Sequence, residues 1–140
     1  MRLVGAMVLG LLCGAQLGCG GEECSLETVD IGFRASPNAP GLYLADVATD
    51  RCGGDGSEEL RYEVTCQGDC PSFTARVFLD AYMIAEEPST TAPYAEIVAH
   101  ESHTPDINEY QLYVETDPEV PPDAYSLQGR FTGSQAHIVP

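Results

Sequence analysis

The sequence predicts an all-β protein, an antiparallel sandwich of two sheets with seven to eight strands. Two observations lead to this prediction. Apolar and polar residues alternate with a period of two in short segments, which is typical of strands that bury one face. The segments between them are rich in proline and glycine, which cannot continue a strand ladder. Strands and turns at this spacing favour two antiparallel sheets packed face to face.

The clearest alternation occurs in five segments, which we predict to be the principal strands: Val29–Phe33, Leu60–Cys66, Phe73–Leu79, Tyr110–Val114 and Tyr125–Phe131. Weaker patterns predict further strands over Leu42–Val47, Tyr94–Ala99 and Gln135–Val139. Between the strands, breakers gather in Ser36–Gly41, Gly53–Ser57, Glu87–Pro93 and Asp117–Pro122. For Asp80–Glu87 two interpretations stay open, an extension of the preceding strand or one helical turn.

One segment indicates a type of sandwich. Asp123–Gly129 follows a proline-rich loop and carries Tyr125 and Leu127 at alternate positions. It resembles the start of the penultimate strand of an immunoglobulin-like domain. The resemblance implies that the Tyr125 hydroxyl bonds back to the backbone of the preceding loop. It bears on the fold and not on function.

The first residues of the chain form an export signal. Arg2 is followed by an apolar stretch that ends in small residues before Cys19. This segment resembles the signal peptide of bacterial lipoproteins, which is cut before an acylated cysteine. Gly18 fits the small position before the cut, while Gln16 stands where that class prefers leucine. The stretch is too short and too rich in glycine for a spanning helix, which needs about 20 apolar residues.

The resemblance implies three parts: a signal peptide over residues 1–18, a lipidated Cys19 with a short tether over residues 19–24, and a β-sandwich domain over residues 25–140. An ordinary signal-peptidase cut, with Gly18 and Gly20 as the small pair, is the alternative. The expected location is the cell envelope, at the outer membrane or cell surface, with the membrane contacted through the lipid. A periplasmic or secreted protein is the alternative.

The mature part is strongly acidic. It contains five arginines and no lysine against 22 acidic residues, a net charge of −17. Nucleic acid needs cationic side chains that displace its counterions, so we exclude nucleic acid as a partner. Anionic lipid headgroups would be repelled for the same reason. Calcium, basic peptides and basic protein surfaces remain as partners of suitable charge.

Four cysteines remain after Cys13 of the leader and Cys19 are set aside: Cys24, Cys52, Cys66 and Cys70. An even number in an exported chain predicts two disulfides, and three pairings are open. We expect Cys66–Cys70, because Gly68 allows a tight turn between them, and therefore Cys24–Cys52. The spacing does not match a thiolate zinc site.

The densest acidic loop contains the calcium candidates Asp50, Asp55, Glu58 and Glu59. Calcium takes several oxygen ligands from a flexible loop, although the spacing is not that of an EF-hand. A solvated loop pinned at Cys52 is the alternative. No other cofactor is expected.

His100 and His103 form the only histidine pair within a short segment. Residues three apart on a strand point to opposite faces, so both rings would reach one metal only in a loop. The spacing is one residue short of the helical metalloprotease motif, and no serine lies in a hydrolase elbow. We therefore expect a protein that is not an enzyme.

Two aromatic residues, Phe78 and Tyr113, fall on the polar sides of their predicted strands. If those strands share a sheet, the pair would form an exposed binding patch with Arg76 and Gln111. We expect instead that a loop or short helix covers them, with Ala81–Ala85 as the candidate.

These observations predict a lipid-anchored, non-catalytic binding or structural module of the cell envelope that holds a protein or a glycan. A small hydrolase or metal-dependent enzyme centred on His100 and His103 is one alternative. A secreted protease inhibitor that presents the loop Asp117–Pro122 is the other.

Overall fold

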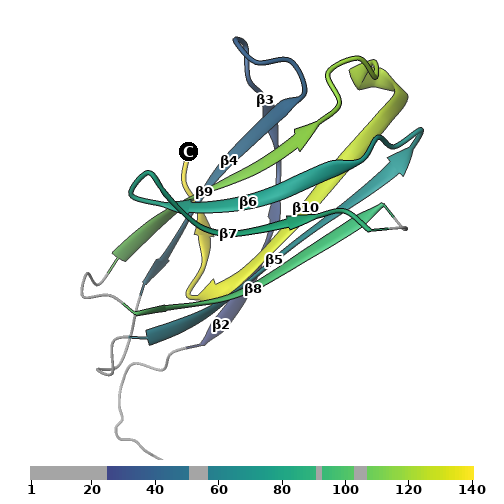
Figure 1. The fold of residues 1–140 in the computed structure, drawn as a ribbon. Helices are drawn as coiled ribbons and strands as arrows, with labels where there is room; N and C mark the ends of the chain where they lie inside the picture. Colours follow the sequence, from purple (N-terminus) through teal and green to yellow (C-terminus); the bar gives the residue numbers. More distant parts are fainter. Residues whose placement is uncertain (1–24, 51–56, 91–92, 103–106) are drawn as a thin grey trace, which may run out of the picture.

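The computed structural model describes residues 25–50, 57–90, 93–102 and 107–140. Two antiparallel sheets pack face to face, which confirms the predicted sandwich (Figure 1). The four-stranded sheet contains, in spatial order, β2 (Leu26–Ile31), β10 (Tyr125–Ser134), β5 (Ser57–Gly68) and β8 (Tyr94–Ser102). The six-stranded sheet contains β11 (His137–Ile138), β4 (Leu42–Asp50), β9 (Ile107–Thr116), β6 (Phe73–Leu79) and β7 (Tyr82–Pro88), with β3 (Arg34–Ala35) paired to β4. A short 3₁₀ helix, η2 (Pro122–Ala124), precedes β10.

The strand order is that of a jelly roll. Apart from the two-residue strands β3 and β11, the described strands run β2-β10-β5-β8 in one sheet and β4-β9-β6-β7 in the other. The first and last long strands are therefore neighbours, and every step between consecutive long strands except β6 to β7 crosses from one sheet to the other, as in a pair of Greek keys. An immunoglobulin domain instead places its first, second, fifth and fourth strands in one sheet. The resemblance seen in the sequence thus extends to the sandwich architecture and not to the strand order.

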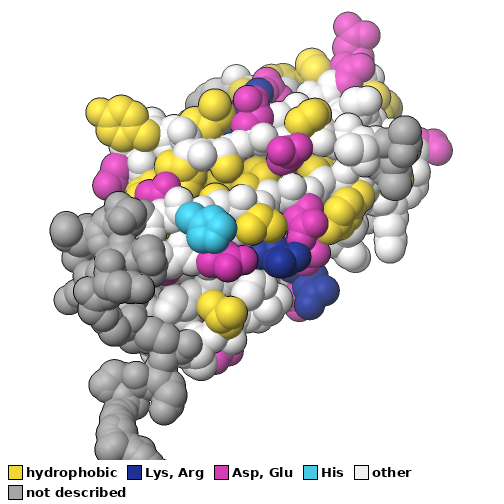
Figure 2. Space-filling view, turned by 60° about the horizontal axis from the view of Figure 1, so that its bottom comes forward, with side chains coloured by type: hydrophobic (Ala, Val, Ile, Leu, Met, Phe, Trp, Pro, Cys, Tyr) yellow, Lys and Arg dark blue, Asp and Glu magenta, His cyan; other side chains and the backbone are white. Residues whose placement is uncertain are grey.

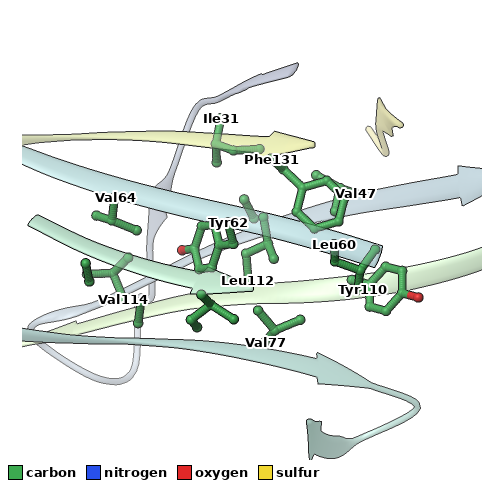
Figure 3. Packing of buried hydrophobic residues seen from close by; sticks show 14 of the residues in the cluster. Ile31, Val47, Leu60, Tyr62, Val64, Val77, Tyr110, Leu112, Val114 and Phe131 are labelled. Atoms are coloured by element: carbon green, nitrogen blue, oxygen red, sulfur yellow. The ribbon is translucent and has the colours of Figure 1, made fainter. Parts of the chain in front are cut away.

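Alternate residues of the strands fill the space between the sheets (Figure 3). The largest fully buried side chains are Tyr62, Tyr110 and Phe131, and Tyr110 and Phe131 bring ring centroids from opposite sheets within 5.9 Å. On β9 the positions between Tyr110, Leu112 and Val114 face outward. The period of two seen in the sequence therefore assigns the core correctly.

The segment after β6 follows neither of its two interpretations. Asp80 and Ala81 have positive φ values of 52° and 68°, which reverse the chain in a tight hairpin turn. Tyr82–Pro88 then returns as strand β7 beside β6. The helical turn is wrong because this strand pairs with β6 along its length, and the extension is wrong because the chain changes direction at Asp80.

The disulfide between Cys66 and Cys70 is present, with 6.0 Å between the Cα atoms. It joins the end of β5 to the segment that leads to β6, and so it braces a crossing from one sheet to the other. Gly68 has a φ of 98° between the two cysteines, as the predicted tight turn requires. The leader, Cys19 and the expected Cys24–Cys52 bond lie outside the described residues. Within the described residues, no helix is long and apolar enough to cross a membrane.

Candidate functional site

The predicted aromatic patch lies on the outer surface of the six-stranded sheet. Strands β6 and β9 are neighbours there, and the ring centroids of Phe78 and Tyr113 are 4.6 Å apart. Gln111 is the direct cross-strand partner of Phe78, and Arg76 is that of Tyr113. Residues opposite each other on paired strands share a face. The structure therefore brings the four predicted binding residues together.

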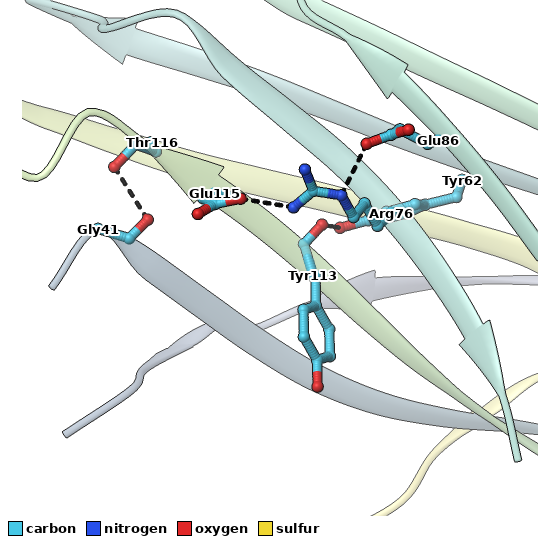
Figure 4. Close-up of polar contacts among 7 residues, drawn as sticks. All are labelled: Gly41, Tyr62, Arg76, Glu86, Tyr113, Glu115 and Thr116. Atoms are coloured by element: carbon cyan, nitrogen blue, oxygen red, sulfur yellow. Dashed lines mark hydrogen bonds and ion pairs between the residues drawn. The ribbon is translucent and has the colours of Figure 1, made fainter. Parts of the chain in front are cut away.

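Arg76 is fixed in the middle of this surface. Its Nε donates to Glu86 at 2.8 Å, and its Nη1 donates to Glu115 at 2.6 Å (Figure 4). The two carboxylates come from the strands on either side of β6, so the guanidinium is clamped from both directions. The hydrogen bonds to Glu115 and Glu86 raise the pKa of Arg76 above the ordinary value of an arginine side chain. The cation stays charged and its orientation is set before any partner arrives.

Two apolar side chains extend the patch. Leu44 on β4 is the cross-strand partner of Tyr113, and Met83 on β7 is the partner of Phe78. Met83 is 49% exposed. We call the surface formed by these residues the aromatic face: Leu44, Arg76, Phe78, Met83, Gln111 and Tyr113. It spans four neighbouring strands.

The expectation that Ala81–Ala85 covers the patch as a loop or short helix is wrong. Those residues belong to the hairpin turn and to β7, which lies beside β6 in the same sheet. Local sequence could not exclude a cover, because the direction that the chain takes after Leu79 depends on the backbone of Asp80 and Ala81. No helix or strand among the described residues is placed over the aromatic face.

Hydrogen bonds from the core hold the strands beneath the face. The Tyr62 hydroxyl reaches across the sandwich from β5 and donates to the Tyr113 carbonyl at 3.3 Å (Figure 4). Burial raises the pKa of Tyr62 well above its ordinary value, so this donor keeps its proton. At one end of β9, Thr116 donates to the Gly41 carbonyl at 3.0 Å.

The calcium candidates do not converge in the described part of the chain. Glu58 is buried, and its Oε2 accepts hydrogen bonds from Thr49 at 2.8 Å and Tyr110 at 2.6 Å. Glu59, the next residue along β5, is exposed on the opposite side of the sheet. Asp50 ends β4, and Asp55 lies outside the described residues. The alternation along β5 separates the two glutamates, which the loop interpretation did not anticipate.

The histidine pair is only half described. His100 lies on β8 with its side chain 73% exposed, and its Nε2 is 3.7 Å from a carboxylate oxygen of Glu59. His103 lies outside the described residues. His100 therefore stands on an open sheet surface beside one carboxylate.

The loop Asp117–Pro122, the candidate inhibitor segment, is held by its own contacts. The Asp117 carboxylate accepts from the Glu119 amide at 2.9 Å, and the Asp117 carbonyl accepts from the Val120 amide at 3.2 Å. The loop then enters η2, which begins at Pro122. These contacts make a compact turn at one end of the sandwich.

Tyr125 bonds differently from the expectation drawn from the immunoglobulin resemblance. Its hydroxyl lies 2.9 Å from the Tyr43 hydroxyl and 3.2 Å from the Thr116 hydroxyl. Its partners are thus side chains of the opposite sheet and not the loop backbone. Burial, followed by the bond to Tyr125, raises the pKa of Tyr43 to about 12. The pair ties the two sheets together at this end.

A second surface feature escaped the sequence analysis. The outer side of the four-stranded sheet contains a hollow of about 500 Å³ between the side chains of its strands. We call it the polar hollow, and its lining is Asp30, Ile31, Glu63, Thr65, Tyr94, Gln128, Gly129 and Arg130. The polar lining residues occupy outward positions of predicted strands. The alternation in the sequence therefore already placed these side chains on the outer surface. Only the pairing of β2, β10, β5 and β8 shows that they lie next to one another.

No protein-family model matches this chain, and no curated protein matches it either.

Proposed function

We propose that this protein is an exported, lipid-anchored, non-catalytic module of the cell envelope whose aromatic face binds a basic surface of another protein. The observation that carries the proposal is the contact between Phe78 and Tyr113 on the outer side of the six-stranded sheet, next to the clamped Arg76. Rings on the solvent side of a sheet contribute little to the core, and they are well suited to contact a partner.

The composition of the aromatic face favours a protein partner. Aromatic residues, methionine and arginine are enriched at the centres of protein interfaces. Residues that contribute most to binding are often tyrosine and arginine, because they combine a large contact area with defined hydrogen bonds. Tyr113, Arg76 and Met83 lie within one patch on a β-sheet. The clamp on Arg76 reduces the conformational entropy that binding would cost.

The charge around the face favours a basic partner. Glu86 and Glu115 flank Arg76 and together outweigh its single positive charge, and Glu109 lies at an exposed outward position on β9, whereas Asp46 on β4 is already paired with Arg34. Opposite charges at the rim of an interface speed association and discriminate between partners. The net charge of −16 of the chain opposes a second copy of the same protein as occupant.

The N-terminal segment supports a location at a membrane surface. If Cys19 is acylated, the tether over residues 19–24 spans less than about 20 Å when fully extended. The domain would then lie close to the lipid headgroups and would meet partners in the same membrane or just beside it. Mass spectrometry of the mature protein tests this part: a first residue Cys19 with acyl chains is expected, and an intact Met1 would overturn it.

Site-directed photo-crosslinking in the producing cells tests the binding face. A photoreactive residue at Gln111 should yield a defined adduct with a basic envelope protein. The same residue at Thr132, on the outer side of the four-stranded sheet, is the matched control and should not yield that adduct. Phe78→Ala should reduce the Gln111 adduct several-fold while the protein remains folded. Equal labelling from both positions, or no adduct from Gln111, would overturn the proposal.

A further inference from the structure

The polar hollow lies on the sheet opposite the aromatic face. Two cross-strand rows of outward side chains line it. In the first row Arg130 on β10 stands between Asp30 on β2 and Glu63 on β5. In the second row Gln128 on β10 is followed by Thr65 on β5 and Tyr94 on β8. The hollow has about 500 Å³, within the range of sites that hold small ligands.

Arg130 differs from the other described arginines. Arg34, Arg61 and Arg76 each pair with a described carboxylate: Asp46, Glu96, and both Glu86 and Glu115, respectively. Arg130 makes no hydrogen bond or ion pair with any residue that the structure describes, although Asp30 and Glu63 are its cross-strand neighbours. Its guanidinium therefore offers its donors to a ligand in the hollow.

Glu63 is positioned by a neighbour. The Tyr94 hydroxyl donates to Glu63 Oε2 at 3.0 Å. Burial, together with this hydrogen bond and the nearby charge of Glu63, raises the pKa of Tyr94, so the hydroxyl remains a donor. Tyr94 also lines the hollow. Figure 2 shows one face of the molecule, on which basic side chains lie next to acidic ones and close to a histidine.

We propose that the polar hollow binds a neutral saccharide. A sugar ring carries hydroxyls that both donate and accept. The carboxylates of Asp30 and Glu63 accept from hydroxyls, Arg130 donates to oxygens, and Gln128 does both. The apolar C–H face of a sugar packs against an aromatic ring such as Tyr94. Two carboxylates against one guanidinium disfavour an anionic sugar. This site is separate from the aromatic face and does not depend on the function proposed for that face.

NMR spectroscopy of the full mature protein tests the proposal. The probes are methyl glycosides of glucose, galactose and mannose, together with N-acetylglucosamine, and sodium glucuronate as the acidic comparison. At least one neutral probe should shift the backbone amide signals of Thr65, Tyr94 and Gln128. The signals of Phe78 and Tyr113 on the opposite sheet should not move. Glucuronate should bind more weakly than the methyl glucoside.

Matched arginine variants give the control. Arg130→Ala should weaken binding of the neutral probe about tenfold or more, since it removes charged hydrogen-bond donors. Arg61→Ala on the same face removes an arginine that is already paired with Glu96 and does not line the hollow, so affinity should change less than about twofold. Tyr94→Phe keeps the ring and releases Glu63, and an intermediate loss is expected.

Three outcomes would overturn the proposal. The first is that no neutral probe shifts the amides of the hollow. The second is that Arg61→Ala weakens binding as much as Arg130→Ala, which would place the ligand elsewhere. The third is that glucuronate binds more tightly than the methyl glucoside, which would make the site one for anions. None of these outcomes bears on crosslinking from Gln111, so the two proposals fail separately.

Discussion

On the outer side of the six-stranded sheet, Arg76 is held between two glutamates beside a pair of aromatic rings. On the outer side of the four-stranded sheet, Arg130 has no partner among the described residues and borders a hollow whose walls include Asp30, Glu63 and Gln128. Both faces consist of the outward positions of antiparallel strands. The two faces differ in whether the arginine on each of them is paired with neighbouring carboxylates.

This difference suggests two kinds of recognition on one scaffold. On the aromatic face Arg76 is already paired with Glu86 and Glu115, so a partner gains from contact area, from the fixed orientation of Arg76 and from the excess negative charge around it. In the polar hollow the side chains of Arg130 and Gln128 make no hydrogen bond with the described part of the chain, so a ligand gains from directed hydrogen bonds. A jelly roll keeps these faces apart, because the core between the sheets separates them.

The largest expected effect comes from the core that both faces share. Phe131 is fully buried between the sheets, and Phe131→Ala should lower the free energy of unfolding by about 3–5 kcal/mol. Phe78→Ala on the aromatic face should cost only about 1 kcal/mol, the value of an aromatic pair at a partly exposed position. Urea unfolding of the two variants gives the comparison. A similar cost at both positions would show that Phe78 serves the core and not a surface.

A smaller difference is expected between two surface arginines. Arg76→Ala leaves Glu86 and Glu115 without their shared cation and should cost about 1 kcal/mol, because partly exposed ion pairs contribute little each. Arg61→Ala releases only Glu96 and should cost about half as much. Both costs should shrink at high salt. If Arg61→Ala proved the more damaging, the clamp on the aromatic face would not be the tighter arrangement.

The smallest effect concerns the tyrosine pair that links the sheets. The folded protein raises the pKa of Tyr43 from 10.0 to about 12, so the folded state holds this proton more tightly than the unfolded state. The stabilisation is fully present below pH 10.0 and is lost as the pH rises toward about 12. Tyr43→Phe should therefore make the fall in stability across that window less steep. Thermal unfolding as a function of pH measures this loss of stability. An unchanged dependence of stability on pH in the variant would contradict a link between Tyr43 ionisation and folding.

Much of the fold could be read from the period of two. The predicted strand Phe73–Leu79 has the bounds of β6, and the segments around Leu60, Tyr110 and Tyr125 all form strands with the expected inward residues. Phe78 and Tyr113 were recognisable as surface candidates because an aromatic side chain at an outward position of a strand does not contribute to packing between the sheets. The pairing of Cys66 with Cys70 followed from the short turn between them.

The polar hollow could not be found in the same way. Asp30, Glu63 and Arg130 lie far apart in the sequence, and each looks like an ordinary solvated charge on its own strand. The strand order decides that they are neighbours, and side-chain packing decides that Arg130 pairs with none of the residues that the structure describes. The separation of Glu58 from Glu59 has the same origin, because a residue in a strand faces the side opposite to its neighbour.

By itself, the order of residues determined which positions face the interior, since burying one side of a strand requires an apolar residue at every second place. It did not determine which strands become neighbours, because many arrangements bury the same apolar residues equally well. Only the folded jelly roll decided that the Arg130 guanidinium and two carboxylates share one hollow, while two rings and a clamped arginine share the opposite side.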